Sequence, residues 1–102
     1  KLIDNSIILG EKGLKRLEKI KSKYSIISDV RGLGLFFGIE LKKNSKPAQK
    51  EAEEVLYHSL SNGLSYKVGG GCILTLCPPM TITEGELNEA FDVIEAGIKE
   101  VS

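Results

Sequence analysis

Three consecutive glycines at residues 69–71 stand before the apolar run "CILTLC" and are the first candidates for chemistry. A glycine-rich loop holds phosphate when it runs from a strand into a helix, because the helix amino terminus binds the anion. The residues after this triplet are typical of a strand, and no Lys-Ser or Lys-Thr pair follows. "RGLGLFFG" also leads into a strand. The triplet is therefore predicted to be a β-hairpin turn, where glycine permits positive φ.

Three further residues have side chains that could react or bind a metal. Cys72 and Cys77 lie five residues apart in a segment predicted to be extended, which separates them by about 16 Å and places them on opposite faces. A disulfide requires Cα atoms within about 7 Å, so we expect two free thiols in a reducing cytosol, buried as small apolar side chains. His58, the single histidine, is expected to be a partly exposed helix cap rather than a catalyst or metal ligand.

The composition describes one small domain without a strong charge. The chain has 102 residues, with 14 Lys and Arg against 14 Asp and Glu. This balance gives no electrostatic reason to expect nucleic acid or an anionic membrane as a partner. No apolar run approaches the roughly 18 residues that span a bilayer, and nothing resembles a secretory signal. We expect a cytoplasmic protein.

The first element that must position these residues is a helix over residues 1–24. Its apolar residues fall mostly three or four positions apart: Leu2, Ile3, Ile7, Leu14, Leu17 and Ile20. The chain begins with Lys and no capping residue precedes the pattern, whereas a helix normally begins at Ser, Thr, Asp or Asn. Asp4 or Asn5 could cap only a shorter helix. We therefore expect a chain cut from a longer protein within or just before this helix.

Two strands are predicted next, the first in "SIISDV" and the second from Leu33 onward. One face of the second strand is apolar and is predicted to be buried: Leu33, Leu35, Phe37, Ile39 and Leu41. The other face carries Gly34, Phe36, Gly38 and Glu40. Glycine in a strand often marks the close approach of another backbone or a ligand. This second face is therefore a candidate docking surface for structure outside the chain.

Two more helices and a hairpin complete the pattern. Pro47 suits the first turn of a helix that ends at Asn62-Gly63, with an apolar stripe of Ala48, Ala52, Val55, Leu56 and Leu60. "LSYKV" and "CILTLC" are predicted strands. "TEGE" is a capping box in which Thr83 and Glu86 bond reciprocally, followed by the apolar face Leu87, Ala90, Phe91, Ile94 and Ile98. The order predicts an α+β fold, a small, mainly antiparallel sheet with helices on one face.

Two segments carry a family resemblance. "DVRGLGLFFGIEL", followed by "CPPMTITEGELNEAFDVIEAGI", resembles the C-terminal small domain of class III pyridoxal-phosphate aminotransferases, the group of 4-aminobutyrate and omega-amino-acid aminotransferases. The resemblance spans residues 26–100. It implies that residues 1–24 are the tail of a segment linking to a large domain outside the chain, and that residues 25–102 are the small domain.

The resemblance implies transfer of an amino group from an amine or amino acid to a 2-oxo acid through a lysine Schiff base. In that family the lysine and the cofactor-binding residues belong to the large domain. The chain is thus expected to contain no catalytic or cofactor-binding residue, to bind no pyridoxal phosphate alone and to be inactive alone. Its implied partners are the large domain and, for the full-length protein, a second copy in a homodimer.

One family position falls on Thr75. Several relatives have an arginine three residues before the first proline of P-P-L, where it binds a substrate carboxylate. The resemblance implies that Thr75 is close to the substrate but cannot pair with a charge, so the parent enzyme either binds a carboxylate elsewhere or accepts amines without one. Strand alternation places Thr75 on the face away from Leu74 and Leu76. Arg31 matches the R of R-G-x-G-L and is expected to brace the turn or the domain junction.

Two other interpretations remain open on the sequence. One is a free-standing module that binds a small ligand or regulates another protein, which should begin with a capped element. The other is a protein-interaction module that uses the face of Gly34, Phe36 and Gly38.

Overall fold

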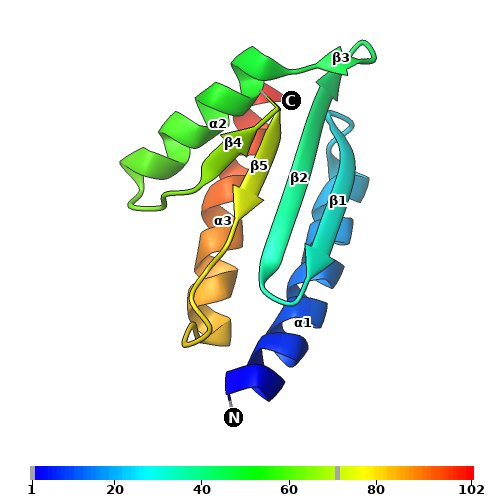
Figure 1. Cartoon of the computed structure of the whole chain (residues 1–102). Coiled ribbons are helices and arrows are strands. Elements are labelled where there is room, and N and C mark those ends of the chain that lie inside the picture. Colours follow the sequence, from blue (N-terminus) through cyan, green and yellow to red (C-terminus); the bar gives the residue numbers. More distant parts are fainter. Residues whose placement is uncertain (1, 71) are drawn as a thin grey trace.

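The computed structural model describes residues 2–70 and 72–102 and contains three helices and five strands (Figure 1). In chain order these are α1 (Leu2–Lys23), β1 (Ile27–Leu33), β2 (Phe36–Lys43), β3 (Lys46–Pro47), α2 (Gln49–Ser61), β4 (Lys67–Gly69), β5 (Ile73–Leu76) and α3 (Glu84–Val101). None of the described helices combines the length and the hydropathy that crossing a membrane requires.

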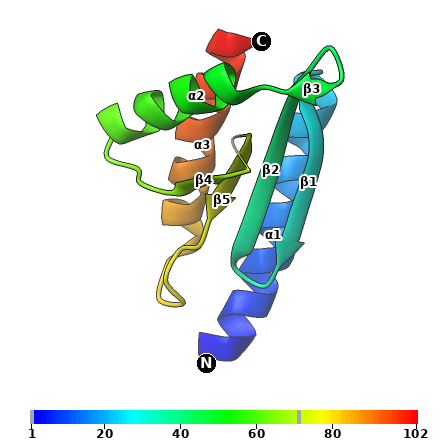
Figure 2. The ribbon, with the colours of Figure 1, turned by 45° about the horizontal axis from the view of Figure 1, so that its top comes forward.

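The strands form one antiparallel sheet, in the order β1-β2-β5-β4, with β3 paired to the end of β2. The helices lie together on one side of this sheet (Figures 1 and 2). The α+β class with helices on one face is thus confirmed. The sequence did not predict the short strand β3: Pro47 belongs to it, and α2 begins two residues later.

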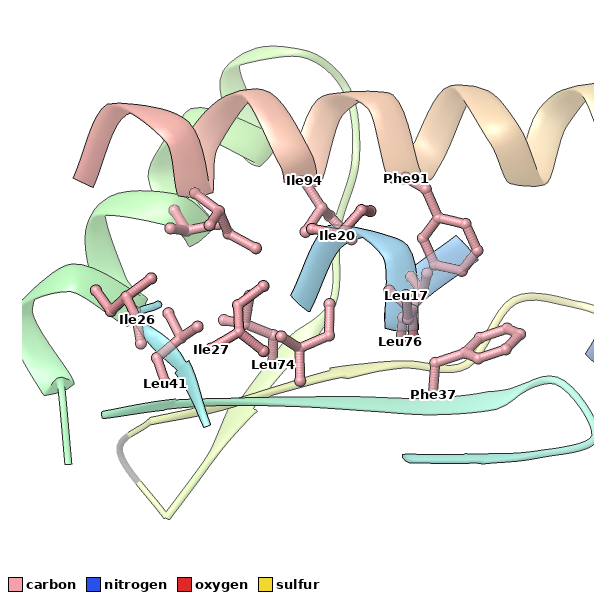
Figure 3. Packing of buried hydrophobic residues seen from close by; sticks show 14 of the residues in the cluster. Leu17, Ile20, Ile26, Ile27, Phe37, Leu41, Leu74, Leu76, Phe91 and Ile94 are labelled. Atoms are coloured by element: carbon pink, nitrogen blue, oxygen red, sulfur yellow. The ribbon is translucent and has the colours of Figure 1, made fainter. Parts of the chain in front are cut away.

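The core fills the space between the sheet and the helices (Figure 3). Phe37 from β2 is fully buried and meets Phe91 from α3 edge to face, with ring centroids 5.3 Å apart. Leu74 and Leu76 of β5 are buried beside them. In β2 and β5, these residues, which the alternation predicted to be buried, therefore face the helices.

Two hairpin turns occur where glycine adopts positive φ, and only the turn at the glycine triplet was predicted, because Gly34 was expected within the second strand. The β4–β5 hairpin is confirmed, with Gly70 at φ +57°; Gly71 of the predicted turn lies outside the described residues. The β1–β2 hairpin turns at Gly34, at φ +58°. The prediction that Leu33 belongs to the buried stripe is wrong, because the turn assigns it to β1, where it is 83% exposed.

The apolar faces expected for α1 and α2 are largely buried, at Leu17 and Ile20 in α1 and at Ala48, Ala52 and Val55 in and just before α2, but one expected residue of each is exposed. In α1, Ile7 is exposed and Leu9 is buried in its place, because the sheet contacts the helix along the line of Leu9, Gly13 and Leu17. In α2, Leu60 is exposed and the polar Ser59 is buried. Ser59 Oγ donates to the carbonyl of Val55 and meets the Tyr66 hydroxyl, each at 2.9 Å, so its burial leaves no polar atom unpaired.

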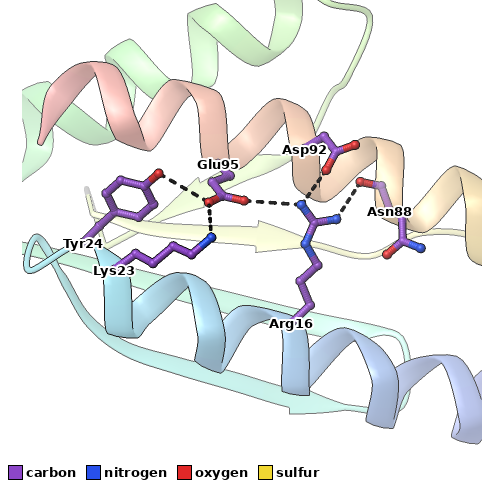
Figure 4. A network of polar contacts seen from close by, with 6 residues as sticks. All are labelled: Arg16, Lys23, Tyr24, Asn88, Asp92 and Glu95. Atoms are coloured by element: carbon purple, nitrogen blue, oxygen red, sulfur yellow. Dashed lines mark hydrogen bonds and ion pairs between the residues drawn. The ribbon is translucent and has the colours of Figure 1, made fainter.

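The helix α1 contacts the β1–β2 turn on one side and α3 on the other. A Cβ on Gly10 would lie 2.2 Å from the carbonyl oxygen of Gly34, so the helix touches the backbone of the β1–β2 turn. Towards α3, Arg16 donates to the Asn88 carbonyl and to the carboxylates of Asp92 and Glu95 (Figure 4). These contacts tie α1 to both the hairpin and the last helix.

The helix α3 begins as predicted. Thr83 Oγ1 accepts from the amide of Glu86 at 3.1 Å, and the Glu86 carboxylate accepts from the amide of Thr83 at 2.9 Å. This capping box satisfies two backbone donors at the start of the helix.

Candidate functional site

The sheet face opposite the helices, which we call the outer face, carries a row of four residues directly opposite one another. Arg31 of β1 pairs with Gly38 of β2, Gly38 with Thr75 of β5, and Thr75 with Lys67 of β4. Residues opposite each other in an antiparallel sheet share a face, with Cβ atoms about 5 Å apart. The row therefore crosses the sheet from one cation to the other, with Thr75 and a glycine between them.

Two glycines lie near Thr75 on the outer face: Gly38 is directly opposite it on β2, and Gly69 is diagonal to it on β4. A Cβ built on Gly38 would come no closer to another side chain than 3.8 Å, from Ile73. A Cβ on Gly69 would lie 4.0 Å from Thr75 Oγ1. Without these side chains, a ligand could approach the sheet backbone on either side of Thr75.

Thr75 itself is half-buried and faces away from the core, as its strand position predicts. Its hydroxyl forms no hydrogen bond with the residues that the structure describes. A free hydroxyl on an open surface can bind a ligand by donating or accepting. Whether a substrate lies there stays a prediction.

Arg31 interacts with two carboxylates on the outer face. Its Nε donates to Asp29 at 2.9 Å, and its Nη2 lies 3.7 Å from Glu40. The hydrogen bond to Arg31 lowers the pKa of Asp29, and the same bond raises the pKa of Arg31. Arg31 thus pairs with Asp29 on its own strand and approaches Glu40 on β2, and a role in bracing the turn or the domain junction stays a prediction.

Lys67 is the cation at the other end of the row. It is exposed, whereas Tyr66 and Val68 on either side pack towards the core. Its ammonium has no ion-pair partner within residues 2–70 and 72–102. The sequence analysis passed over Lys67 because its only signal is cross-strand register, which becomes visible once β4 and β5 are paired.

The other residues with reactive side chains lie apart from this row. His58 Nδ1 lies 3.1 Å from a carboxylate oxygen of Glu100, linking α2 to α3. Both cysteines are free thiols, but the expectation that both are buried is wrong: Cys72 is buried and Cys77, beyond the end of β5, is exposed. Within the described residues, no group of His, Cys, Asp or Glu could hold a metal ion.

The described residues do not fit pyridoxal phosphate. The cofactor requires a lysine in an enclosed pocket for its Schiff base, and each lysine from Lys12 to Lys99 is exposed. A groove of about 450 Å³ lies between α1 and α3, lined by Lys12, Arg16, Glu84 and Glu95 among others. Its two carboxylates pair with cations across the groove, as Glu84 does with Lys12 at 3.0 Å. The groove is thus a contact between two helices.

Residues 1–98 match the family described as Aminotransferase class-III. Over 90 residues the chain is 41% identical to the (R)-1-hydroxy-2-aminoethylphosphonate ammonia-lyase of Vibrio splendidus, covering 85% of this chain and 19% of that protein. It is 36% identical to the leucine/methionine racemase of Thermococcus litoralis, over 91% of this chain and 22% of that protein.

The fold also matches a solved structure. The acetylornithine aminotransferase from Elizabethkingia anophelis superposes with a TM-score of 0.87 and 34% sequence identity, covering 98% of this chain and 24% of that one. The chain therefore spans about a fifth to a quarter of the length of the relatives that it matches.

Proposed function

The chain belongs to the class III aminotransferase family, whose members depend on pyridoxal phosphate, and from this we propose that it is the C-terminal small domain of a longer enzyme. In this proposal residues 1–24 are the tail of the segment that links it to the large domain. The carrying observation is the family match over residues 1–98, together with a fold that covers only a quarter of a related aminotransferase.

The reaction that we propose is transfer of an amino group from an amine or amino acid to a 2-oxo acid, as in the 4-aminobutyrate and omega-amino-acid group. The large domain supplies the cofactor site, because the described part of this chain has no enclosed lysine. This chain supplies one wall of the substrate cleft through its outer face, with Thr75 close to the substrate. Alone, it is inactive and binds no pyridoxal phosphate.

A second reaction has a specific observation in its favour. The relative with 41% identity is an ammonia-lyase, which releases ammonia rather than passing an amino group to an acceptor. Thr75 supplies no charge for an α-carboxylate, so a donor without that carboxylate fits either reaction.

The partners that we propose are the large domain and a second full-length copy. The outer face and the β1–β2 turn are the surfaces of this chain for the large domain, since Phe36 and Leu33 are exposed there without cover. Burial of such apolar side chains is the usual source of domain association.

The test uses the full-length protein loaded with pyridoxal phosphate. Amine and amino-acid donors are added with and without a 2-oxo acid, and three products are followed: the aminated acceptor, free ammonia and the opposite enantiomer of the donor. An aminated acceptor is the expected result. Ammonia released without an acceptor would support the lyase, and racemisation alone would contradict both reactions. The isolated chain should give no product.

A further inference from the structure

We propose that Lys67 and Thr75 together bind the anionic group of the substrate, a phosphonate, phosphate or carboxylate, on the outer face of the sheet. This inference rests on the proposed function, because it places the substrate over the outer face. It adds a positive charge to a position that threonine alone leaves neutral.

The register brings the two groups together. Lys67 is directly opposite Thr75 in the β4–β5 hairpin, so both side chains rise from the same face on adjacent strands about 4.8 Å apart. The ammonium supplies up to three donors and the hydroxyl one more. An anion above the hairpin can therefore contact both.

The burial of the residues on either side shows to which face of the sheet the Lys67 side chain points. Tyr66 and Val68 pack against the core, and Lys67 between them is exposed. Alternation in a strand then points Lys67 away from the helices. The exposed position also leaves the lysine stem free to bend towards Thr75.

The charges around the row favour the Lys67 end. Arg31, at the far end, is already paired with Asp29 at 2.9 Å and approached by Glu40 at 3.7 Å, so its charge is already offset by carboxylates. Lys67 has no carboxylate partner in the described part of the chain. An anion on the outer face is thus drawn towards Lys67 and away from Glu40.

The glycines leave room for such a group. Gly38 is directly opposite Thr75 on β2 and Gly69 is diagonal to it on β4, and neither contributes a side chain above the sheet. A phosphonate or carboxylate can therefore rest against the backbone beside the Thr75 hydroxyl. A larger residue at either position would occupy this space.

The first experiment measures anion binding without requiring turnover. Inorganic phosphate is titrated into the full-length, cofactor-loaded enzyme by calorimetry, so that the phosphate site of the cofactor is already filled. Lys67→Met should weaken phosphate binding at least about tenfold, and Lys67→Arg should retain it. The matched control Lys99→Met removes another exposed lysine without a described ion pair, on α3, and should bind as the unaltered protein does.

Equal binding by Lys67→Met and the unaltered protein, an equal loss in Lys99→Met, or no phosphate binding at all would overturn the proposal. Thr75→Val, which replaces the hydroxyl by a methyl group of similar size, provides a second variant should Lys67→Met fold poorly. It should also weaken phosphate binding. Unchanged binding in Thr75→Val would remove Thr75 from the site.

The second experiment compares donors that differ in charge. In the full-length enzyme, kcat/KM is measured for β-alanine and 2-aminoethylphosphonate, which carry an anionic group, and for n-propylamine, which carries none. Lys67→Met should lower the kcat/KM of the two donors with an anionic group, relative to that of n-propylamine, about tenfold or more, since this ratio reports differential binding of the transition state. An equal loss for all three donors would contradict the proposal.

The two proposals fail in different ways. An enzyme that transfers no amino group from any donor, but whose phosphate binding depends on Lys67, would overturn the proposed reaction and leave this site in place. Amino transfer with phosphate binding that is independent of Lys67 would overturn the site alone.

Discussion

Thr75 has Gly38 directly opposite it on β2 and Gly69 diagonal to it on β4, so its position tolerates a longer side chain. We predict that Thr75→Arg in the full-length enzyme raises kcat/KM for carboxylate-bearing donors and leaves amines without a carboxylate unimproved. The physical reason is a bidentate pair between guanidinium and carboxylate, with about 2–5 kcal/mol available when such a pair is buried. The check is the ratio of kcat/KM for the two donor types.

An unchanged ratio, in a variant shown to be folded and loaded with cofactor, would mean that Thr75 does not face the substrate. The matching control is Thr81→Arg, in the loop before α3 and outside the outer-face row. This second arginine should not alter the ratio.

The hydrogen bond of the Tyr66 hydroxyl has a contribution to stability that can be measured. Since Ser59 Oγ donates to the Val55 carbonyl, the Tyr66 hydroxyl donates to Ser59. We predict that Tyr66→Phe lowers the free energy of unfolding by about 1 kcal/mol, the usual net contribution of one such bond. Urea denaturation of the isolated chain followed by circular dichroism measures this change.

The same residue gives a dependence on pH. Burial raises the pKa of Tyr66, so the unfolded state, with a tyrosine pKa of about 10, loses this proton first. Its contribution to stability is complete below pH 10 and is lost as the pH rises through the folded-state pKa. Tyr66→Phe should therefore lose less stability between pH 8 and 10.5 than Tyr57→Phe, whose parent side chain is 62% exposed. Equal losses of stability in the two variants would mean that a group other than Tyr66 causes the pH dependence.

Among the elements, α1 packs directly against the turn of the β1–β2 hairpin at Gly10. Gly10→Ala would place a Cβ 2.2 Å from the Gly34 carbonyl oxygen and 2.6 Å from its carbon, so one backbone must move. We predict a loss of about 1–3 kcal/mol, typical of overpacking, despite the better helix propensity of alanine. Urea denaturation of the isolated chain measures it.

Gly85→Ala is the control for this prediction. Gly85 lies in the first turn of α3, and a Cβ there meets nothing closer than Thr83 Oγ1 at 4.0 Å. This variant should be as stable as the original chain or more so, by up to about 1 kcal/mol. An equal loss in both variants would show that the flexibility of glycine matters more than the contact with Gly34.

Elements specified by neighbouring residues could be predicted from the sequence, and those specified by distant partners could not. The capping box of Thr83 and Glu86 is contained in four residues and formed as expected. Burial of Ser59 instead of Leu60 depends on a hydroxyl partner, Tyr66, from the segment before β4. The row through Lys67 likewise depends on register between strands, which no local pattern records.

At the scale of the whole molecule, exposed apolar side chains gather at one end. The start of α1, the β1–β2 turn and the loop before α3 lie at that end in both views (Figures 1 and 2). These segments carry most of the large exposed apolar residues within the described chain: Ile7, Ile8, Leu33, Phe36 and Met80. We predict that the isolated chain self-associates through this apolar end, and sedimentation velocity at several concentrations would detect it.

Replacing two of these residues should abolish the self-association of the isolated chain. Leu33→Ser with Phe36→Ser is expected to give a monomer. Tyr57→Ser, which removes an equally exposed aromatic residue on α2, should associate like the original chain. A chain that sediments as a monomer at every concentration would contradict the prediction.

The placement of β5 beside β2 has a kinetic consequence. The β1–β2 hairpin closes over a short turn and can form within about 1–10 μs, whereas β2 finds β5 only across the whole segment that contains α2. Closing that long loop costs entropy before any contact is gained. We therefore expect β5 to dock after the rate-limiting step. In stopped-flow experiments, Val30→Ala in β1 should slow refolding, while Leu74→Ala in β5 should mainly accelerate unfolding. The reverse pattern would mean that the pairing of β2 with β5 belongs to the folding nucleus.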